Sequence, residues 1–292
     1  MQMSSLSANA TASTSRSTPS ETTVVIRPSR GLFDLDLASL WEFREILYFL
    51  VWRDVKLRYK QTAIGAAWAI LQPLATMAIF TVIFGHLAKI PSDGLPYALF
   101  AFTGLLPWIY FSQAIARSGA SVVSDANLIK KVYFPRLLIP IAAILSPLVD
   151  FLISFVFLLG MVAWFGIRPG WSVVTLPFFL ALAMITALAA GLWLSALNVK
   201  YRDVGHTLPF LIQIWLYASP VAYSVTLIPE KWRLVYGLNP MAGAIEGFRW
   251  ALLQKERPAL GVIAISAVVV FALLIGGVIF FKRLERTFAD DV

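Results

Sequence analysis

The stretch Arg53-Asp-Val-Lys-Leu-Arg-Tyr-Lys60 stands directly before a long apolar segment that begins near Thr62. Its cations stop where the sequence becomes apolar enough for the hydrocarbon core of a bilayer. Lys and Arg collect on the cytoplasmic side of a membrane, and the first span usually sets the orientation of the rest. The stretch therefore predicts that the chain enters the membrane here, with its N-terminus in the cytoplasm.

The composition is typical of a polytopic membrane protein. Hydrophobic residues make up 59% and charged residues 14% of the chain, whereas a soluble domain is about half apolar and about a quarter charged. The net charge of +8 is explained by cations between the apolar runs, so we expect membrane lipids and no nucleic acid as partners. Because there is no Cys, and His86 and His206 lie far apart, we expect no metal site.

Several apolar segments are long enough to cross a bilayer, which takes about 20 apolar residues. We therefore predict an all-α membrane protein with six transmembrane helices within residues 61–282. The predicted spans are residues 62–87, 97–116, 137–165, 173–197, 207–224 and 260–281.

The ends of the chain are predicted to lie in the cytoplasm. Residues 1–38 are rich in Ser, Thr and Ala without the apolar run of a signal peptide, so we expect a disordered tail. Residues 39–60 mix aromatic and charged side chains and predict an amphipathic helix in the membrane interface. Ser39 and Glu42 have the spacing of a capping box at its start. Residues 283–292 are predicted to form a cytoplasmic C-terminus.

The distribution of Lys and Arg supports this orientation with one exception. The first two outer segments carry only Lys89 and Arg168, whereas the last one is rich in cations. In that segment, helical apolar spacing follows the break at Asn239-Pro240, which predicts re-entrant outer helices within residues 226–256. Such backbone is tolerated in a membrane only against protein or a water-filled cavity. The cations of the exception are Lys231, Arg233, Arg249, Lys255 and Arg257.

A short helix over residues 124–135 is predicted between the second and third spans, and Pro135 stops it. It has an apolar ridge and a basic side, and such a helix can dock into a groove of a cytoplasmic partner. The alternative is a solvated loop resting on lipid headgroups. The residues predicted to contact the partner are Asp125, Asn127, Leu128, Ile129, Lys130, Lys131, Val132 and Tyr133.

Four stretches together resemble the membrane subunit of type-2 ATP-binding-cassette (ABC) exporters, in the polysaccharide branch that exports O-antigen, capsule and teichoic acid. They are residues 53–74, residues 126–136, Asn198-Val-Lys-Tyr-Arg-Asp-Val204 and Leu238-Asn-Pro-Met241. The resemblance implies six spans, an interface helix, re-entrant helices before the last span, and a homodimer. It also implies that residues 126–136 couple to a separate cytoplasmic ABC ATPase, present in two copies.

The sequence contains no nucleotide site of its own. A P-loop needs a glycine-rich turn that ends in Gly-Lys-Ser/Thr, and no Gly-Lys dipeptide occurs in the chain. We therefore expect no cofactor in this chain, with ATP and Mg on the partner ATPase.

Aromatic and polar side chains recur at helical spacing in the first, second and fifth predicted spans. Aromatic faces and amide groups suit sugars, which combine apolar C–H faces with hydroxyls. The alternative is ordinary interface anchoring and helix packing. The residues predicted to line a conduit are Trp68, Gln72, Thr76, Trp108, Tyr110, Phe111, Gln213 and Tyr217.

Five charged residues have two interpretations each. Arg53, Lys56, Arg58 and Lys60 lie at the inner headgroup level, where anionic lipids explain them; the sharper hypothesis is contact with the pyrophosphate of a lipid-linked glycan. Asp150 falls well inside the third predicted span, where a charge costs at least ~2.5–3.5 kcal/mol. It is a gate or proton site, or a paired contact between helices; we favour the paired contact.

The resemblance implies a permease of the bacterial inner membrane that acts in lipopolysaccharide biosynthesis. The transported molecule would be a lipid-linked, O-antigen-like polysaccharide that leaves the cytoplasmic leaflet. The alternative within the same fold is export of a small hydrophobic drug or a single lipid. A membrane enzyme is disfavoured because Asp203 and Glu230 stand without acidic neighbours, and Asp150 alone gives little support to an ion-coupled transporter.

Overall fold

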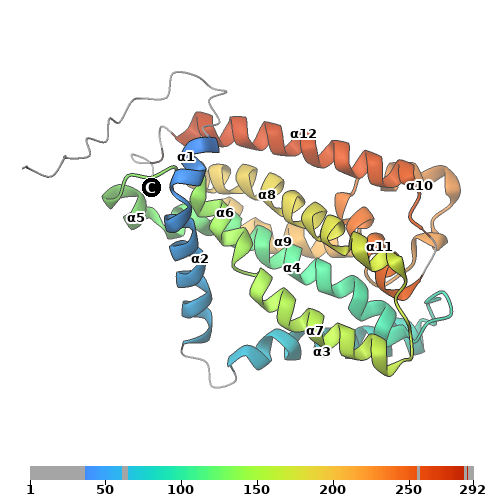
Figure 1. Ribbon diagram of the computed structural model, residues 1–292. Helices are drawn as coiled ribbons and strands as arrows, with labels where there is room; N and C mark the ends of the chain where they lie inside the picture. The colour runs from blue at the N-terminus through green and yellow to red at the C-terminus, as the bar shows by residue number, and fades with distance from the viewer. Residues whose placement is uncertain (1–36, 61–64, 255–256, 286–287, 289–292) are drawn as a thin grey trace, which may run out of the picture. The chain divides into compact units, whose positions relative to one another are not determined.

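The computed structural model describes residues 37–60, 65–254, 257–285 and 288, and all regular structure within these residues is helical (Figure 1). This confirms the all-α class for the described part of the chain. The predicted tail, residues 1–38, lies outside the described residues apart from its last two. The same holds for most of the predicted C-terminus, residues 283–292.

Two helices precede the membrane spans, namely α1 (Leu37–Glu42) and α2 (Arg44–Tyr59). They stand at a steep angle to the long helices, at one end of them (Figure 1). The predicted capping box is wrong, because Ser39 lies inside α1 rather than before it. Leu37 and Ala38 are both good helix formers, so the helix already includes them.

Within the described residues, five helical segments are long and apolar enough to cross a membrane. The predicted fifth span, residues 207–224, is instead occupied by α9 (Asp203–Tyr217) and the turn after it. At 15 residues, α9 is about 22 Å long, shorter than the hydrocarbon core of about 30 Å. The five segments are Gly65–Leu87, Tyr97–Ser124, Leu138–Trp164, Trp171–Lys200 and Leu260–Glu285.

Some of these segments contain more than one helical element. The first comprises a short 3-10 turn, α3 (Trp68–Phe80) and a π-helical end (Thr81–Leu87). The third is divided at Ser146-Pro147 into α6 (Leu138–Leu145) and α7 (Leu148–Trp164). The others contain α4 (Tyr97–Ser124), a 3-10 turn (Trp171–Thr175) with α8 (Leu176–Lys200), and α12 (Leu260–Glu285).

The core is built around α4, which is buried along most of its length and packs most extensively on α8. Small residues allow this close approach. A Cβ atom on Gly191 of α8 would lie 2.3 Å from the hydroxyl of Ser118 on α4. By contrast, most of α3 and α12 is not buried within the chain, so these helices have faces available to lipid or to another chain.

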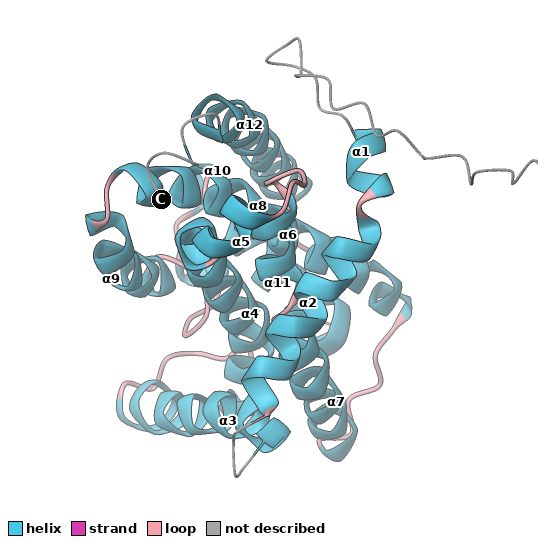
Figure 2. Ribbon diagram, turned by 90° about the vertical axis from the view of Figure 1, so that its left-hand side faces the viewer, coloured by secondary structure: helices cyan, strands magenta, loops and turns pink. Residues whose placement is uncertain are grey.

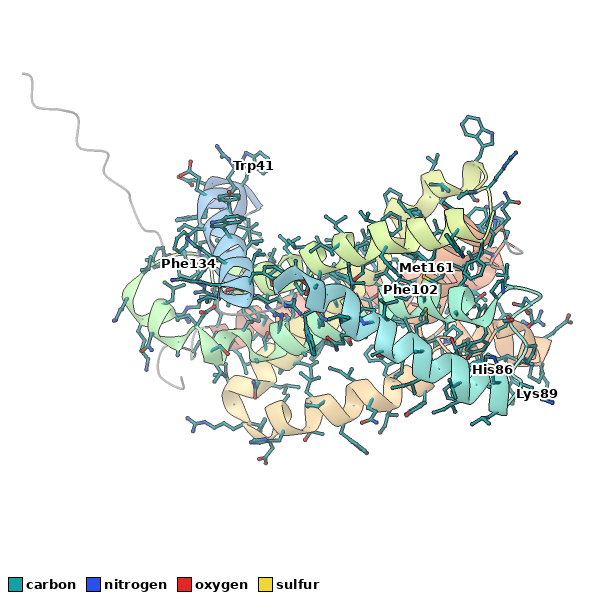
Figure 3. The ribbon with its side chains drawn as sticks, turned by 90° about the horizontal axis from the view of Figure 1, so that it is seen from below. Trp41, His86, Lys89, Phe102, Phe134 and Met161 are labelled. Carbon is teal, nitrogen blue, oxygen red and sulfur yellow. The ribbon has the colours of Figure 1, made fainter. Side chains whose placement is uncertain are left out.

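The two ends of the long helices carry different parts of the chain. Trp41 and Phe134 lie at one end, whereas His86 and Lys89 lie at the other (Figure 3). Phe102 and Met161 lie between them, in the main apolar core. The end with α1 and α2 is the one predicted to face the cytoplasm.

The segment between α9 and α12 folds back against the core. It contains a 3-10 turn (Val225–Leu227), α10 (Glu230–Tyr236) and α11 (Pro240–Leu253), and α11 is almost entirely buried. Asn239 caps α11 by accepting from the amide of Met241 at 3.1 Å, and it also accepts from Trp215 Nε1 at 2.9 Å. The Asn-Pro pair therefore fixes the start of α11 to the end of α9.

Arg249 of α11 is a core residue and not part of an outer loop. It is 1% exposed and lies over the ring of Phe100, 3.6 Å from its centroid. Its guanidinium donates to the carbonyls of Pro220 and Val221 at 2.6 and 2.7 Å. Arg249 therefore does not count as an exception to the predicted distribution of Lys and Arg, because it is bonded inside the protein and is not a loop cation.

Asn198 fixes the corner between α8 and α9. Its side-chain amide donates to the carbonyl of Gly119 on α4 at 3.0 Å, and its oxygen accepts from the amide of Gly205 at 3.1 Å. Asn198, which belongs to the family-like stretch of residues 198–204, therefore joins α4, α8 and α9.

Candidate functional site

A cavity of about 550 Å³ lies among the end of α2, the start of the first span, α4 and the break between α6 and α7. Figure 2 shows α2, α3, α4 and α7 on one side of the molecule. The volume of this cavity is in the range of ligand pockets. It is lined by Arg58, Tyr59, Gly65, Trp68, Ala69, Gln72, Leu106, Ile109, Tyr110, Gln113, Pro147, Asp150, Phe151 and Ser154.

One end of the cavity is charged. Asp150, which is 7% exposed, forms an ion pair with Arg58 and accepts a hydrogen bond from the Tyr59 hydroxyl. Arg58 also donates to Gln113 Oε1 at 3.0 Å. Pairing of Asp150 between helices, the interpretation favoured from the sequence, is confirmed. Its partners come from α2, so the interface helix is fastened to the third span at the cavity.

Tyr59 stays protonated at neutral pH. Burial, and then its hydrogen bond to Asp150, raise the pKa of the Tyr59 phenol to about 12. The phenol is therefore a permanent donor to the Asp150 carboxylate, which needs such partners at this depth.

The other wall of the cavity is aromatic and apolar. Trp68 and Gln72 come from α3, Tyr110 from α4 and Phe151 from α7. The Tyr110 hydroxyl donates to the carbonyl of Ile144 at 3.1 Å, which fixes its ring. Three residues predicted to line a conduit, Trp68, Gln72 and Tyr110, are therefore brought together here.

The remaining residues of the conduit prediction are not among those that line the cavity. Trp108 and Phe111 are buried, and the Phe111 ring meets Trp215 of α9 at 4.9 Å between centroids. In the single chain these two side chains serve as core. Gln213 and Tyr217 are exposed on α9, and Thr76 bonds the carbonyl of Gln72 on α3 at 3.0 Å.

The four predicted phosphate contacts, in α2 and at its C-cap Lys60, have three different environments. Arg53 bonds Asp54 and Asp125, each at 2.9 Å, and the hydrogen bond to Asp125 raises the pKa of its guanidinium. Arg58 lines the cavity, whereas Lys56 and Lys60 are exposed. The structure therefore does not bring the four predicted phosphate contacts together at one point.

The predicted partner-binding helix is shorter than its sequence pattern indicated. It is α5 (Ala126–Lys131), and Val132 is already extended. Pro135 restricts only Phe134 directly before it, so it limits how far the helix can extend but does not itself set the end at Lys131. Ile129 is buried, while Val132 and Tyr133 are exposed, so the predicted apolar ridge is divided between the protein's core and its surface. Asn127, Lys130 and Lys131 are also exposed.

The family is decided by comparison with known proteins. Residues 45–253 match the family model described as ABC-2 type transporter. The chain belongs to this ABC-2 type transporter family. The matched region runs from α2 to the end of α11 and includes the whole cavity. This ABC-2 transporter is a multi-pass membrane protein and a transport permease, not an enzyme.

Several relatives are similar over nearly their full lengths. The O-antigen export system permease protein RfbA of Myxococcus xanthus is 32% identical, over 87% of this chain and 98% of the relative. The protein of the same name from Klebsiella pneumoniae is 29% identical, over 84% and 94%. The polysialic acid transport protein KpsM of Escherichia coli is 24% identical, over 80% and 91%.

Sequence reasoning did not assign Tyr59 and Gln113 to the site of this ABC-2 transporter. Tyr59 lies inside the stretch that places α2, between two cations that did receive a role. Gln113 follows Leu106 and Tyr110 at intervals of four and three, the spacing of one helix face. That spacing could have identified Gln113 as a neighbour of Tyr110.

Proposed function

We propose that this ABC-2 transporter is the membrane subunit of an ATP-driven exporter of a lipid-linked, O-antigen-like polysaccharide. The molecule would move from the cytoplasmic leaflet across the bacterial inner membrane. The observation that carries the proposal is the similarity to an O-antigen export permease over 98% of that protein. The similarity to a polysialic acid transport protein supports the same class of cargo.

The proposed exporter acts as a homodimer with a conduit formed by both copies. Gln72 on α3 and Gln213 on α9 are exposed in the single chain, on helices that are otherwise largely apolar. An exposed amide has no hydrogen-bond partner in hydrocarbon and is costly there. A second copy or a hydrated sugar chain would satisfy both amides. Trp68, Thr76 and Tyr217 remain predicted conduit residues on the same helices.

The transmembrane topology of the proposal has six spans with both termini in the cytoplasm. In this topology α9 would be the fifth span and shorter than the others. The turn after it and the re-entrant helices α10 and α11 would occupy the outer half of the membrane. The burial of α11 and its capping contact with α9 support a shared unit of this kind.

ATP and Mg would bind to two copies of a cytoplasmic ABC ATPase, which α5 and the residues after it would contact. The exposed residues of this segment, which would form the contact surface, are Asn127, Lys130, Lys131, Val132 and Tyr133. Asp125, Leu128 and Ile129 would then position the surface from behind, since Asp125 is bonded to Arg53 and Ile129 is buried.

Affinity purification of the chain in mild detergent, with mass identification of its partners, tests the proposal. We expect a P-loop ATPase in stoichiometric amount, and its loss when Lys130 and Lys131 are both changed to Glu. Lys200→Glu is the matched control, because Lys200 is an exposed cation outside α5. Purification of a lone oligomer, under conditions that preserve known ABC complexes, would contradict the proposal.

The nature of the cargo is tested separately with sealed vesicles that contain the chain and its ATPase. We expect ATP-dependent movement of a radiolabelled lipid-linked glycan and none of a fluorescent hydrophobic drug. Movement of the drug alone would replace polysaccharide export by the alternative function.

A further inference from the structure

Two segments that are far apart in the chain meet at the end of the long helices that is predicted to face the cytoplasm. One is residues 125–136, here called the coupling segment, which includes α5, and the other is the last turn of α12. Both lie at the end that carries α1 and α2 (Figure 1). Arg136 and Glu285, 149 positions apart, bond to each other there. The coupling segment is therefore in direct contact with the last span.

The contact between Arg136 and Glu285 consists of two hydrogen bonds, both donated by Arg136. Its backbone amide donates to Glu285 Oε1 at 3.3 Å, and its guanidinium donates to the Glu285 carbonyl. The last four carbonyls of an α-helix have no partner within the helix, and Glu285 is the last residue of α12. The Arg136 amide lies just before α6, which begins at Leu138. The contact therefore satisfies backbone groups at two helix ends.

The charges of these two side chains suit the helix ends beside them. A helix carries partial negative charge at its C-terminus, where the Arg136 guanidinium lies on α12, and partial positive charge at its N-terminus, where the Glu285 carboxylate lies near α6. Both residues are partly buried, so salt screens the interaction less than at an exposed site. The contact therefore favours one placement of the coupling segment relative to α12.

An apolar cluster joins the same two segments. Ile129 and Phe134 of the coupling segment belong to it, together with Phe281 of α12 and Phe288 just beyond α12. All four are buried, and the rings of Phe281 and Phe288 meet at 5.2 Å between centroids. Leu50 of α2 is buried in the same cluster. The coupling segment is therefore packed against both α2 and the end of α12.

We propose that Arg136 and Glu285 are positioning residues that fix the coupling segment to the last span, so that the end of α12 moves with this segment when the ATPase works. The segment is held at its start by the bond from Asp125 to Arg53 of α2, and at its end by α12. Coupling between distant sites is carried by packed side chains and hydrogen bonds of this kind. A force applied to the exposed residues between the two bonds therefore reaches two helices.

The inference rests on the proposed function, which makes the coupling segment the contact with the ATPase. It is tested in sealed vesicles that contain the full chain and its ATPase, by measuring export of radiolabelled lipid-linked glycan per ATP hydrolysed. Arg136→Met removes the bond to the Glu285 carbonyl, and Glu285→Ala removes the bond to the Arg136 amide. We expect each variant to lower export per ATP about two- to tenfold, the change that one hydrogen bond makes to an equilibrium. The ATPase should still purify with both variants in stoichiometric amount.

Two matched variants are the controls. Arg283→Met makes the same substitution at an exposed cation of the last turn of α12 and should leave export per ATP unchanged. Glu285→Gln keeps an oxygen that can accept from the Arg136 amide and should retain most of the coupling. An equal loss in Arg283→Met and Arg136→Met would overturn the inference.

A covalent link tests the inference independently of the stability of the single variants. Because the chain has no Cys, Arg136→Cys and Glu285→Cys can be combined and joined by a short linker that a reductant cleaves. The unlinked double variant should be poorly coupled, and linkage should restore export per ATP, because the two segments move together. A link that blocks export, with recovery after reduction, would overturn the inference.

The results for the ATPase separate this inference from the proposed function. Normal export per ATP in Arg136→Met and Glu285→Ala, with the ATPase bound, would overturn the inference and leave the proposed function intact. Loss of the ATPase from a folded Arg136→Met variant would also overturn it, because the contact would then serve docking. Absence of an ATPase from the unsubstituted chain would contradict the proposed function, and the inference with it.

Discussion

Arg53 on α2 and Asp125 at the start of α5 are 72 positions apart in the sequence, and their side chains meet at 2.9 Å. This ion pair links the helix predicted to lie in the membrane interface to the segment proposed to contact the ATPase. Five residues further along α2, Arg58 pairs with Asp150 of the third span. One helix therefore joins the proposed coupling surface to the cavity.

The Arg53–Asp125 pair predicts a loss of coupling without a large loss of stability. We expect Arg53→Ala and Asp125→Ala each to lower glycan-dependent ATP hydrolysis by the complex several-fold. Unfolding free energy should change by only about 0.2–1 kcal/mol, because both side chains are partly exposed. The double variant should be no worse than the worse single one.

Asp54→Ala is the control for this pair, because Arg53 keeps Asp125 as a partner. Additive losses in the double variant, measured at matched expression, would show that the two residues act independently.

Arg249 predicts the largest single effect on stability. In Arg249→Met the carbonyls of Pro220 and Val221 lose a buried donor and Glu246 loses its cation. Breaking a buried pair in this way costs about 3–5 kcal/mol, so the melting temperature in detergent should fall sharply. Arg233→Met is the matched control: its side chain is 38% exposed, lies 3.9 Å from Glu230 and donates to the Ile228 carbonyl at 3.1 Å, so its loss should cost about 1 kcal/mol. Equal melting temperatures for the two variants would contradict the assigned role of Arg249.

Asn239 predicts a smaller effect at the joint between α9 and α11. Asn239→Ala removes the cap of α11 and the acceptor of Trp215, whereas the carbonyl of Ala218 keeps the Tyr236 hydroxyl as a donor at 2.9 Å. Loss of a cap alone costs about 1 kcal/mol, and the partly buried Trp215 donor left unpaired adds about 1–3 kcal/mol. Thermal unfolding checks this against Asn127→Ala, an exposed asparagine of α5. An Asn239→Ala variant as stable as Asn127→Ala would show that the joint does not depend on this side chain.

Replacement of glycine by alanine is expected to have opposite effects on stability at Gly247 and at Gly160. A Cβ on Gly247 of α11 would lie 2.1 Å from the Phe179 ring, whereas one on Gly160 of α7 meets nothing within 4 Å. Gly247→Ala should therefore destabilise the protein by about 1–3 kcal/mol through overpacking. Gly160→Ala should be neutral or stabilising by up to about 1 kcal/mol, because alanine favours a helix. Melting temperatures of both variants in one detergent decide the matter, and a destabilised Gly160→Ala would count against this packing.

The local sequence was sufficient to predict the helical class and the position of most spans. A bilayer accepts only helices or closed barrels, and it requires about 20 apolar residues in a run. Such runs are visible in the sequence without any knowledge of contacts. This reasoning did not predict how short α9 is, because the apolar pattern of α9 continues into the turn at Ser219-Pro220. That turn is apolar because it is buried against α11, and not because it faces lipid.

The cations show where local patterns were not enough. The four positive charges of residues 53–60 look equivalent in sequence, yet Arg53 bonds Asp125, Arg58 bonds Asp150, and Lys56 and Lys60 are exposed. The partners lie on helices far away in the chain, and the side on which each cation falls depends on how α2 packs.

The sequence by itself determined that this chain is a multi-pass helical membrane protein with no P-loop of its own, and its motifs indicated the family. Hydropathy and motifs are properties of neighbouring residues, so they can be recognised before folding. Only the tertiary structure decided that Asp150 has partners, that Arg249 is core, and that Trp68, Gln72 and Tyr110 share one cavity. Those are properties of contacts between distant segments of the chain. A charged side chain that would be solvated on the surface forms structural hydrogen bonds and ion pairs when the fold buries it.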